Sequence, residues 1–233
     1  ALRTRVNPVI AYPLALTSFS LKQCKQLSIL LEDALLPTLR INRKMKRAVV
    51  YAPLELGGAG LPNIQCVQDQ KGIQHLVRQL EWGREPAEDL RITLSQLQLQ
   101  TGFLAPLLAN PTPTAPHIEA GWLSHIRERL SALNAHVEIE GAWTPTAQRV
   151  NDQSLMDVFC GMKKKGRMSD AKLRQVNRVR IWLKVITIAE LADPDGACIS
   201  PEKFDGRWRN TSTYTWPNQP FPTDKMFATF YDY

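Results

Sequence analysis

The sequence predicts a mainly α fold: a helical subdomain and a second helical subdomain with an irregular, aromatic-rich tail. Three observations support this. Apolar residues recur at helical spacing in several segments, with polar residues between them. Ser20 and Ser169 stand where helix-capping residues are expected. Pro106, Pro111, Pro113 and Pro116 exclude a helix or a central strand where they cluster.

The periodicity places the elements in order along the chain. Residues 14–19 are expected to be extended and to lead into a helix that Pro37 ends. Helices are predicted at 20–36, 64–82, 87–101, 117–133, 154–162 and 169–191, with short extended pieces at 49–56 and 137–143. The last part of the chain looks irregular, but its many aromatic residues indicate that it lies against a surface, because disordered tails are poor in aromatics.

The proline cluster also predicts the domain organisation. We expect a first helical region at 1–104, a proline-rich linker at 105–116 and a helical C-terminal region at 117–233. The first region contains a glycine-rich turn built on Gly57, Gly58, Gly60 and Pro62. Three glycines in four positions allow positive φ angles and close backbone approach.

The positive charge of the chain is concentrated in two places. The net charge is +7, yet residues 40–47 carry +5 and residues 163–184 carry +8, so the remainder carries −6. Such concentration favours a polyanionic partner, since phosphate neutralisation requires clustered cations. The candidate nucleic-acid-binding residues are Arg40, Arg43, Lys44, Lys46 and Arg47 in the first basic patch, and Lys163, Lys164, Lys165, Arg167, Arg174, Arg178, Arg180 and Lys184 in the second basic patch.

The helix predicted at 169–191 has an apolar stripe of Val176, Val179, Leu183 and Ile186. Arg174 and Arg178 are expected on one flank of this stripe, with Arg180 and Lys184 on the other. This pattern suits a helix whose apolar stripe packs on a core and whose two cationic flanks contact phosphates. The alternative is an ordinary amphipathic helix whose cations pair with acids elsewhere in the fold.

The sequence lacks the motifs of several enzyme classes. The chain has no nucleophile elbow, no H-E-x-x-H motif and no phosphate-binding Walker loop. The four cysteines are too widely spaced for a zinc site, and the acid pairs Glu32-Asp33 and Glu88-Asp89 are expected on solvated helix faces. No apolar run is long enough to span a membrane. We therefore expect no catalytic residue, metal or cofactor on this chain, and an intracellular location.

Residues 12–82 resemble a known family. Tyr12-Pro13-Leu14, Leu36-Pro37, Arg47-Ala48-Val49-Val50-Tyr51-Ala52-Pro53-Leu54 and Gly57-Gly58-Ala59-Gly60-Leu61-Pro62-Asn63-Ile64 are similar to the segment after the palm in non-LTR (LINE-type) retroelement reverse transcriptases. The most similar members are reverse-transcriptase-like open reading frames of protists and algae. Arg149, Asp152, Asn177-Arg178-Val179-Arg180 and Tyr214-Thr215-Trp216-Pro217 extend the resemblance. Ala59 stands where the family usually has leucine.

The resemblance implies a thumb-like helical region that holds a primer–template duplex by its backbone, followed by a C-terminal extension. Catalysis in that family belongs to palm aspartates, so the parent protein would be an RNA-directed DNA polymerase and this chain alone would be inactive. The implied partners are an RNA or DNA duplex and an upstream palm domain of the same polypeptide. The alternative function is a non-catalytic helical scaffold whose basic patches bind acidic proteins.

Overall fold

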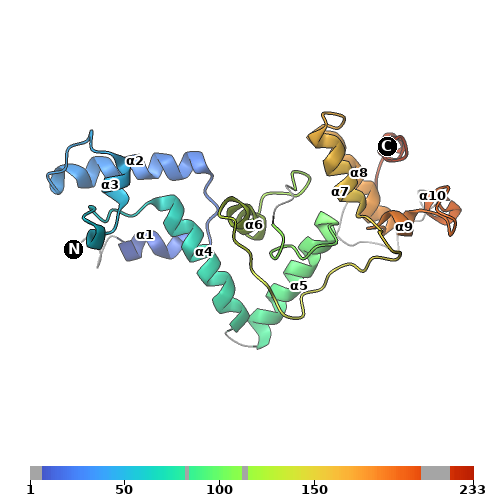
Figure 1. The fold of residues 1–233 in the computed structure, drawn as a ribbon, viewed down its shortest axis with the longest axis horizontal. Helices are drawn as coiled ribbons and strands as arrows, with labels where there is room; N and C mark the ends of the chain where they lie inside the picture. The colour runs from blue at the N-terminus through green and yellow to red at the C-terminus, as the bar shows by residue number, and fades with distance from the viewer. Residues whose placement is uncertain (1–6, 82–83, 112–114, 206–220) are drawn as a thin grey trace. The chain divides into compact units, whose positions relative to one another are not determined.

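The computed structural model describes residues 7–81, 84–111, 115–205 and 221–233, and within these ranges it contains eleven α-helices (Figure 1). The mainly α prediction is confirmed. In this part of the chain the extended backbone forms only isolated bridges, Ser154 with Thr187 and Ala192 with Ile199, and no strand. Nor does any described helix have the length and apolar character needed to cross a membrane.

The chain divides into two compact units. Unit 1 comprises Ala1–Ala87 and Gly121–Ile126, and unit 2 comprises Glu88–Ala120 and Arg127–Tyr233. The division falls inside a helix at residue 87 and not at the proline cluster, and the described residues of the predicted linker lie within unit 2.

Unit 1 is built on three helices, α1 (Asn7–Leu14), α2 (Leu21–Thr38) and α4 (Ile64–Glu81), of which α1 and α2 both pack on α4 (Figure 1). Leu14, Cys24 and Ile64 form the centre of their common core. Ser20 begins α2 as predicted, in a capping box with Gln23. The helix α1 was not predicted from the sequence, and the prediction that Pro37 ends α2 is wrong, since the helix includes Pro37 and continues to Thr38.

The buried side chain of Gln68 on α4 forms hydrogen bonds to the segment before α2. Its Oε1 accepts a hydrogen bond from Phe19 N at 3.0 Å, and its Nε2 donates to Phe19 O at 3.2 Å. The amide thus pairs with both backbone groups of one residue, as a neighbouring strand would. This pairing satisfies the backbone N–H and C=O groups of an extended residue that does not pair with a strand.

The glycine-rich turn folds back on the short helix α3 (Arg47–Tyr51) and the 3₁₀ turn η2 (Leu54–Leu56). Ala59 N donates to Val49 O, Gly60 N to Ala52 O and Leu61 N to Val50 O, all at 2.9–3.1 Å. A Cβ on Gly58 would lie 2.1 Å from Ala52 O, so no other residue fits this close approach. The extended piece predicted at 49–56 is therefore wrong, because α3 and η2 occupy it.

Unit 2 contains most of α5 (Arg84–Thr101), part of α6 (Trp122–Ala132), and α7 (Leu155–Lys164), α8 (Asp170–Leu183), α9 (Ile188–Leu191), α10 (Pro201–Asp205) and α11 (Asp224–Tyr231). Its core is one apolar cluster in which α7, α8 and α11 meet. The buried members include Phe159, Val176, Val179, Phe227 and Phe230. Both α7 and α11 pack on α8, and α11 contacts it most extensively.

Three predictions for unit 2 need correction. The helix expected at 169–191 is broken, because Lys184 adopts a left-handed conformation (φ 56°) that ends α8, and α9 restarts only at Ile188. The helix expected at 117–133 begins at Trp122. The piece at 137–143 joins no strand, although Val137 N donates to Leu108 O.

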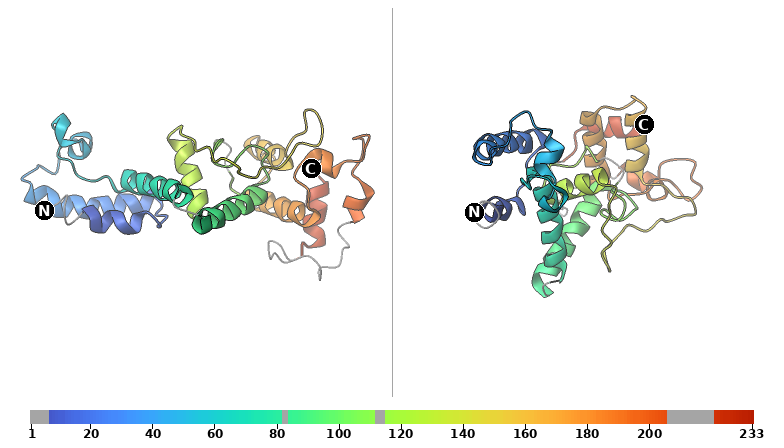
Figure 2. Two further views of the ribbon diagram at one scale, coloured as in Figure 1. Left: turned by 90° about the horizontal axis from the view of Figure 1, so that it is seen from below. Right: turned by 60° about the vertical axis from the view of Figure 1, so that its left-hand side comes forward.

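The described part of the C-terminal tail contains two helices, α10 and α11, that the sequence did not predict. The helix α11 inserts Phe227 and Phe230 into the core of unit 2, so the expectation that the tail lies against a surface is confirmed for residues 221–233. The helix α11, red, crosses α8 and contacts it (Figure 2). Trp208, Tyr214 and Trp216 fall outside the described residues.

Candidate nucleic-acid interface

The first basic patch is the connection between α2 and α3. All five of its cations are exposed, and Arg40 holds a positive φ of 56° just after α2. Arg47 also braces the loop from within, because its Nη1 donates to Arg43 O at 3.1 Å and to Met45 O at 3.3 Å. The loop conformation thus depends on one of its own cations.

Two acids of α2 neutralise part of this patch. Arg47 pairs with Glu32 at 2.8 Å, and Arg43 approaches Asp33 at 3.7 Å. Glu32 is only 6% exposed and also accepts a hydrogen bond from Tyr51 Oη, so it is not the solvated residue that the sequence predicts. Burial and the Glu32 carboxylate raise the pKa of Tyr51 to about 12.

Three cations of the first patch therefore remain to bind another molecule. Among the described residues, no ion pair is recorded for Arg40, Lys44 or Lys46. They lie close together in sequence on an exposed loop. The first basic patch is thus a modest cationic surface, partly balanced by its own helix.

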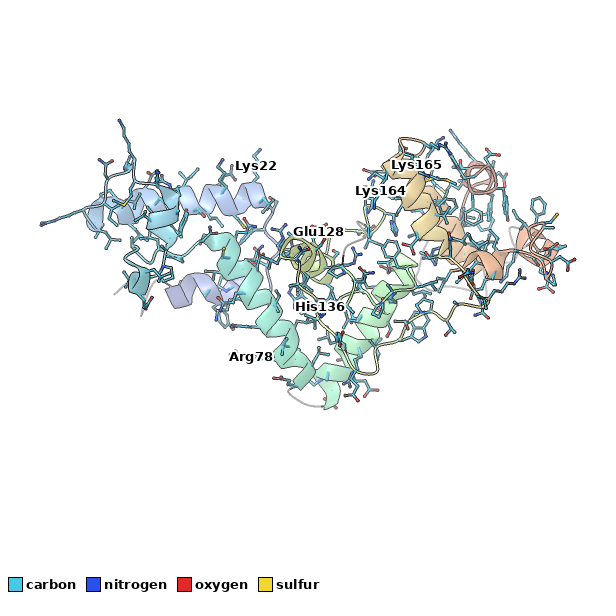
Figure 3. The ribbon with its side chains drawn as sticks, viewed as in Figure 1. Lys22, Arg78, Glu128, His136, Lys164 and Lys165 are labelled. Carbon is cyan, nitrogen blue, oxygen red and sulfur yellow. The ribbon has the colours of Figure 1, made fainter. Side chains whose placement is uncertain are left out.

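The second basic patch covers the turn between α7 and α8 and the exposed side of α8. Lys164 and Lys165 extend from the end of α7 (Figure 3), and the exposed Arg167 follows them in the turn. Arg174 and Arg178 lie one helical turn apart on α8, outside its buried stripe. The described residues contain no recorded acid partner for these five cations.

Lys163 of this patch and the neighbouring Lys172, which was not among the candidates, are already engaged. Lys163 forms an ion pair with Asp170 across the turn. Lys172 donates from Nζ to Tyr233 Oη at 2.8 Å and lies 5.2 Å from the centre of the Tyr233 ring. Tyr233 Oη in turn donates to Arg167 O at 3.3 Å. The sequence analysis did not associate Tyr233 with the patch, because a contact over 61 residues leaves no local pattern.

Arg180 is a correction to the predicted site. The side chain is 1% exposed, so it cannot contact a phosphate on the surface. Its Nη2 donates to Leu99 O at 2.6 Å and to Gln100 O at 3.1 Å, while Nη1 donates to Val185 O and Nε to Asn177 Oδ1. Burial lowers its pKa to about 9, an effect that the Glu190 carboxylate opposes. Arg180 holds the fold together and does not belong to the interface.

Arg180 belongs to a set of side chains that satisfies the C-terminal carbonyls of α5. These carbonyls have no partners within their own helix. Asn177 Nδ2 donates to Gln100 O at 3.1 Å, His117 Nε2 donates to Thr101 O at 3.0 Å, and Ser154 Oγ donates to Gly102 O at 2.7 Å. We call His117, Ser154, Asn177 and Arg180 the α5 cap. It joins α5 to α7, α8 and the segment before α6, and so fixes the helix that carries Arg174 and Arg178.

Gly102 leaves room for this cap. It has a φ of +70°, and a Cβ there would lie 2.7 Å from Arg180 Cζ and 2.9 Å from Met156 Cγ. A larger residue would be strained by the backbone and would also push the guanidinium away from the carbonyls.

No group of three or more His, Cys, Asp or Glu side chains in the described part of the chain could hold a metal ion. Cys24 and Cys160 are buried, whereas Cys66 and Cys198 are exposed, and all four are free thiols. Burial raises the pKa of Cys160 to about 11, so that thiol is protonated near neutral pH and is a poor nucleophile.

Comparisons of the chain with protein-family models, with curated proteins and with solved structures give no match.

Proposed function

We propose that this chain is the thumb and C-terminal extension of a reverse-transcriptase-like retroelement protein, and that it binds the sugar–phosphate backbone of a primer–template. The observation that carries the proposal is the second basic patch. Lys164, Lys165, Arg167 and Arg174 are exposed and Arg178 is half-buried, and none of the five has an acid partner among the described residues. Such a set is suited to phosphates, which bind without regard to base sequence.

The glycine-rich turn supports the family assignment indirectly. Gly57 and Gly60 adopt positive φ angles and Gly58 has no room for a Cβ, so the conformation of the turn favours glycine at each of these positions of the motif. In the proposal, this turn shapes the region between the first basic patch and α4. The catalytic aspartates would lie in the palm domain of the same polypeptide, which is the second proposed partner.

The proposal predicts a steep salt dependence of binding. Each phosphate that a lysine or arginine neutralises releases counterions, so log K should fall against log salt with a slope of about −0.9 per contact on double-stranded DNA. Contacts from these five cations of the second patch would give a slope of about −4.5. Titrating a labelled duplex by fluorescence anisotropy at several salt concentrations measures this slope.

The double variant Arg174→Glu/Arg178→Glu should reduce the magnitude of that slope by about two units. The matched control is Lys22→Glu/Lys25→Glu, which makes the same change of charge at exposed positions of α2, outside both patches. The control should leave the slope close to that of the wild-type chain. If both double variants change the slope equally, net charge and not the second patch determines binding, and the proposed interface is wrong.

A protein-binding scaffold is the second candidate, and one observation favours it. Unit 1 exposes several large apolar side chains, of which Tyr12 is 86%, Leu56 80% and Leu30 66% exposed. Exposed apolar surface of this kind is typical of protein contacts. A wild-type chain that fails to bind a duplex at low salt, about 50 mM, would favour this candidate.

A further inference from the structure

Exposed aromatic residues border the second basic patch at both ends of α8. Tyr233 is 40% exposed and contacts Lys172 near the start of the helix. Phe221 is 42% exposed and packs edge-on against Trp182 near the end of the helix, with ring centres 4.9 Å apart. Trp182 follows Arg178 by one turn, so the cations of α8 lie between two aromatic sites.

Both aromatic residues come from one segment, 221–233. Phe221 precedes α11 and contacts Trp182 near the end of α8, and Tyr233 follows α11 and contacts Lys172 near its beginning. The segment is anchored by Phe227 and Phe230, which are 2% and 3% exposed in the core. The two exposed rings thus lie just before and just after a helix that is packed in the core.

The arrangement of rings and cations bears on the kind of nucleic acid that fits. Cations alone are sufficient to bind a duplex, because its bases are already stacked on one another and offer no free ring face. A single strand exposes its bases, and proteins that bind single strands place aromatic rings beside a cationic track on which those bases stack. The ring of Tyr233 already contacts the Lys172 ammonium, so it is positioned next to the path of a bound backbone.

We infer that the second basic patch binds single-stranded nucleic acid, with Tyr233 and Phe221 as stacking platforms for unpaired bases and the cations of α8 as backbone contacts. The inference rests on the proposed function and deepens it: on a primer–template, this patch takes the unpaired template strand. The ligand is recognised by its phosphates and by the flat faces of its bases, not by base sequence.

The test compares two ligands with the same number of phosphates. One is a single-stranded oligothymidine of about twelve nucleotides, within the site sizes of single-strand binding proteins. The other is an abasic strand of equal length, which has no bases to stack. The wild-type chain should bind the oligothymidine at least about tenfold more tightly, because stacking contributes about 1–3 kcal/mol per base.

Variants at Tyr233 then locate the effect. Tyr233→Leu should weaken oligothymidine binding by about tenfold to a hundredfold and leave binding of the abasic strand and of a duplex unchanged. Tyr233→Phe keeps the ring and should stay within about threefold of the wild type. Phe221→Leu should give a second loss confined to the base-containing strand. Thermal unfolding of each variant checks that α11 remains packed.

Three results would overturn the inference. Equal wild-type affinity for the oligothymidine and the abasic strand would show that bases make no contact. A loss in Tyr233→Leu that is equal for both strands would show that the ring only positions Lys172. In either case salt-dependent duplex binding would still support the proposed function. Failure to bind any of the three ligands would overturn the proposed function as well.

Discussion

Replacing Arg180 with methionine is expected to lower the free energy of unfolding of unit 2 by about 3–5 kcal/mol. Methionine has no donors, so Leu99 O, Val185 O and Asn177 Oδ1 each lose a buried hydrogen bond. Each buried acceptor left without a partner costs about 1–3 kcal/mol. Urea unfolding followed by circular dichroism measures the change.

Arg178→Met is the matched control, because it removes the same side chain two residues away on the same helix. Arg178 lies outside the buried set of α8, so its replacement should change the unfolding free energy by no more than about 0.5 kcal/mol. The two variants should also differ in binding. Arg178→Met should reduce the salt slope by about one unit, whereas Arg180→Met, where folded, should leave it unchanged. Equal destabilisation by the two variants would contradict the structural role of Arg180.

Acidification is expected to destabilise unit 2 through His117, which is 6% exposed. The pKa of this histidine is lowered from 6.5 to about 4, mainly by burial, against the opposite effect of the hydrogen bond to Thr101 O; the nearby cations Arg180, Arg127 and Lys163 contribute to the lowering. Above pH 6.5 the ring is neutral in both the folded and the unfolded chain. Between pH 6.5 and 4 only the unfolded chain takes up the proton, so stability falls by about 3 kcal/mol as the pH drops.

The measurement is the free energy of unfolding at several pH values between 7 and 4, for the wild type and for His117→Asn. The variant cannot take up this proton, so it should lose about 3 kcal/mol less than the wild type over that range. His136→Asn, at an exposed position, is the control and should follow the wild-type profile. If His117→Asn and the wild type lose the same stability, other groups cause the acid sensitivity.

Helix periodicity predicted most of unit 1 and unit 2 correctly, because local spacing determines which face of a helix is apolar. It failed where polar residues occupy buried positions. Arg180 follows the buried Val176 by four residues and precedes the buried Leu183 by three, so its position in the helix points inward. The positive charge of Arg180 favoured a surface position, whereas its spacing from buried residues favoured the core. Its hydrogen-bond partners at residues 99 and 100 leave no pattern in the sequence around Arg180.

Glu32 in unit 1 is a second charged residue whose position in its helix, and not its charge, indicates burial. It precedes the buried Leu36 by one turn of α2, and so lies on the inner face of the helix. Its partners, Tyr51 and Arg47, come from α3, a helix that the sequence predicted as extended. The candidate cations could be listed from the sequence, but which of them are exposed and unpaired depends on contacts between distant segments. The break at Lys184 was hidden for a related reason, since one left-handed residue ends a helix without interrupting the apolar pattern.

The closure of unit 2 by α11 has a consequence for how the protein is made. Arg180 reaches a carbonyl 81 residues earlier, and the core remains open until Phe227 and Phe230 pack against α8. The contacts with α11 can form only after that helix has been synthesised, which comes long after α5 in the order of translation. The growing chain therefore presents the apolar side of α8 to other molecules before its own cover exists, and contacts over such long separations form slowly. Unit 2 is expected to complete its core only after α11 has been synthesised, and to depend on protection from aggregation until then.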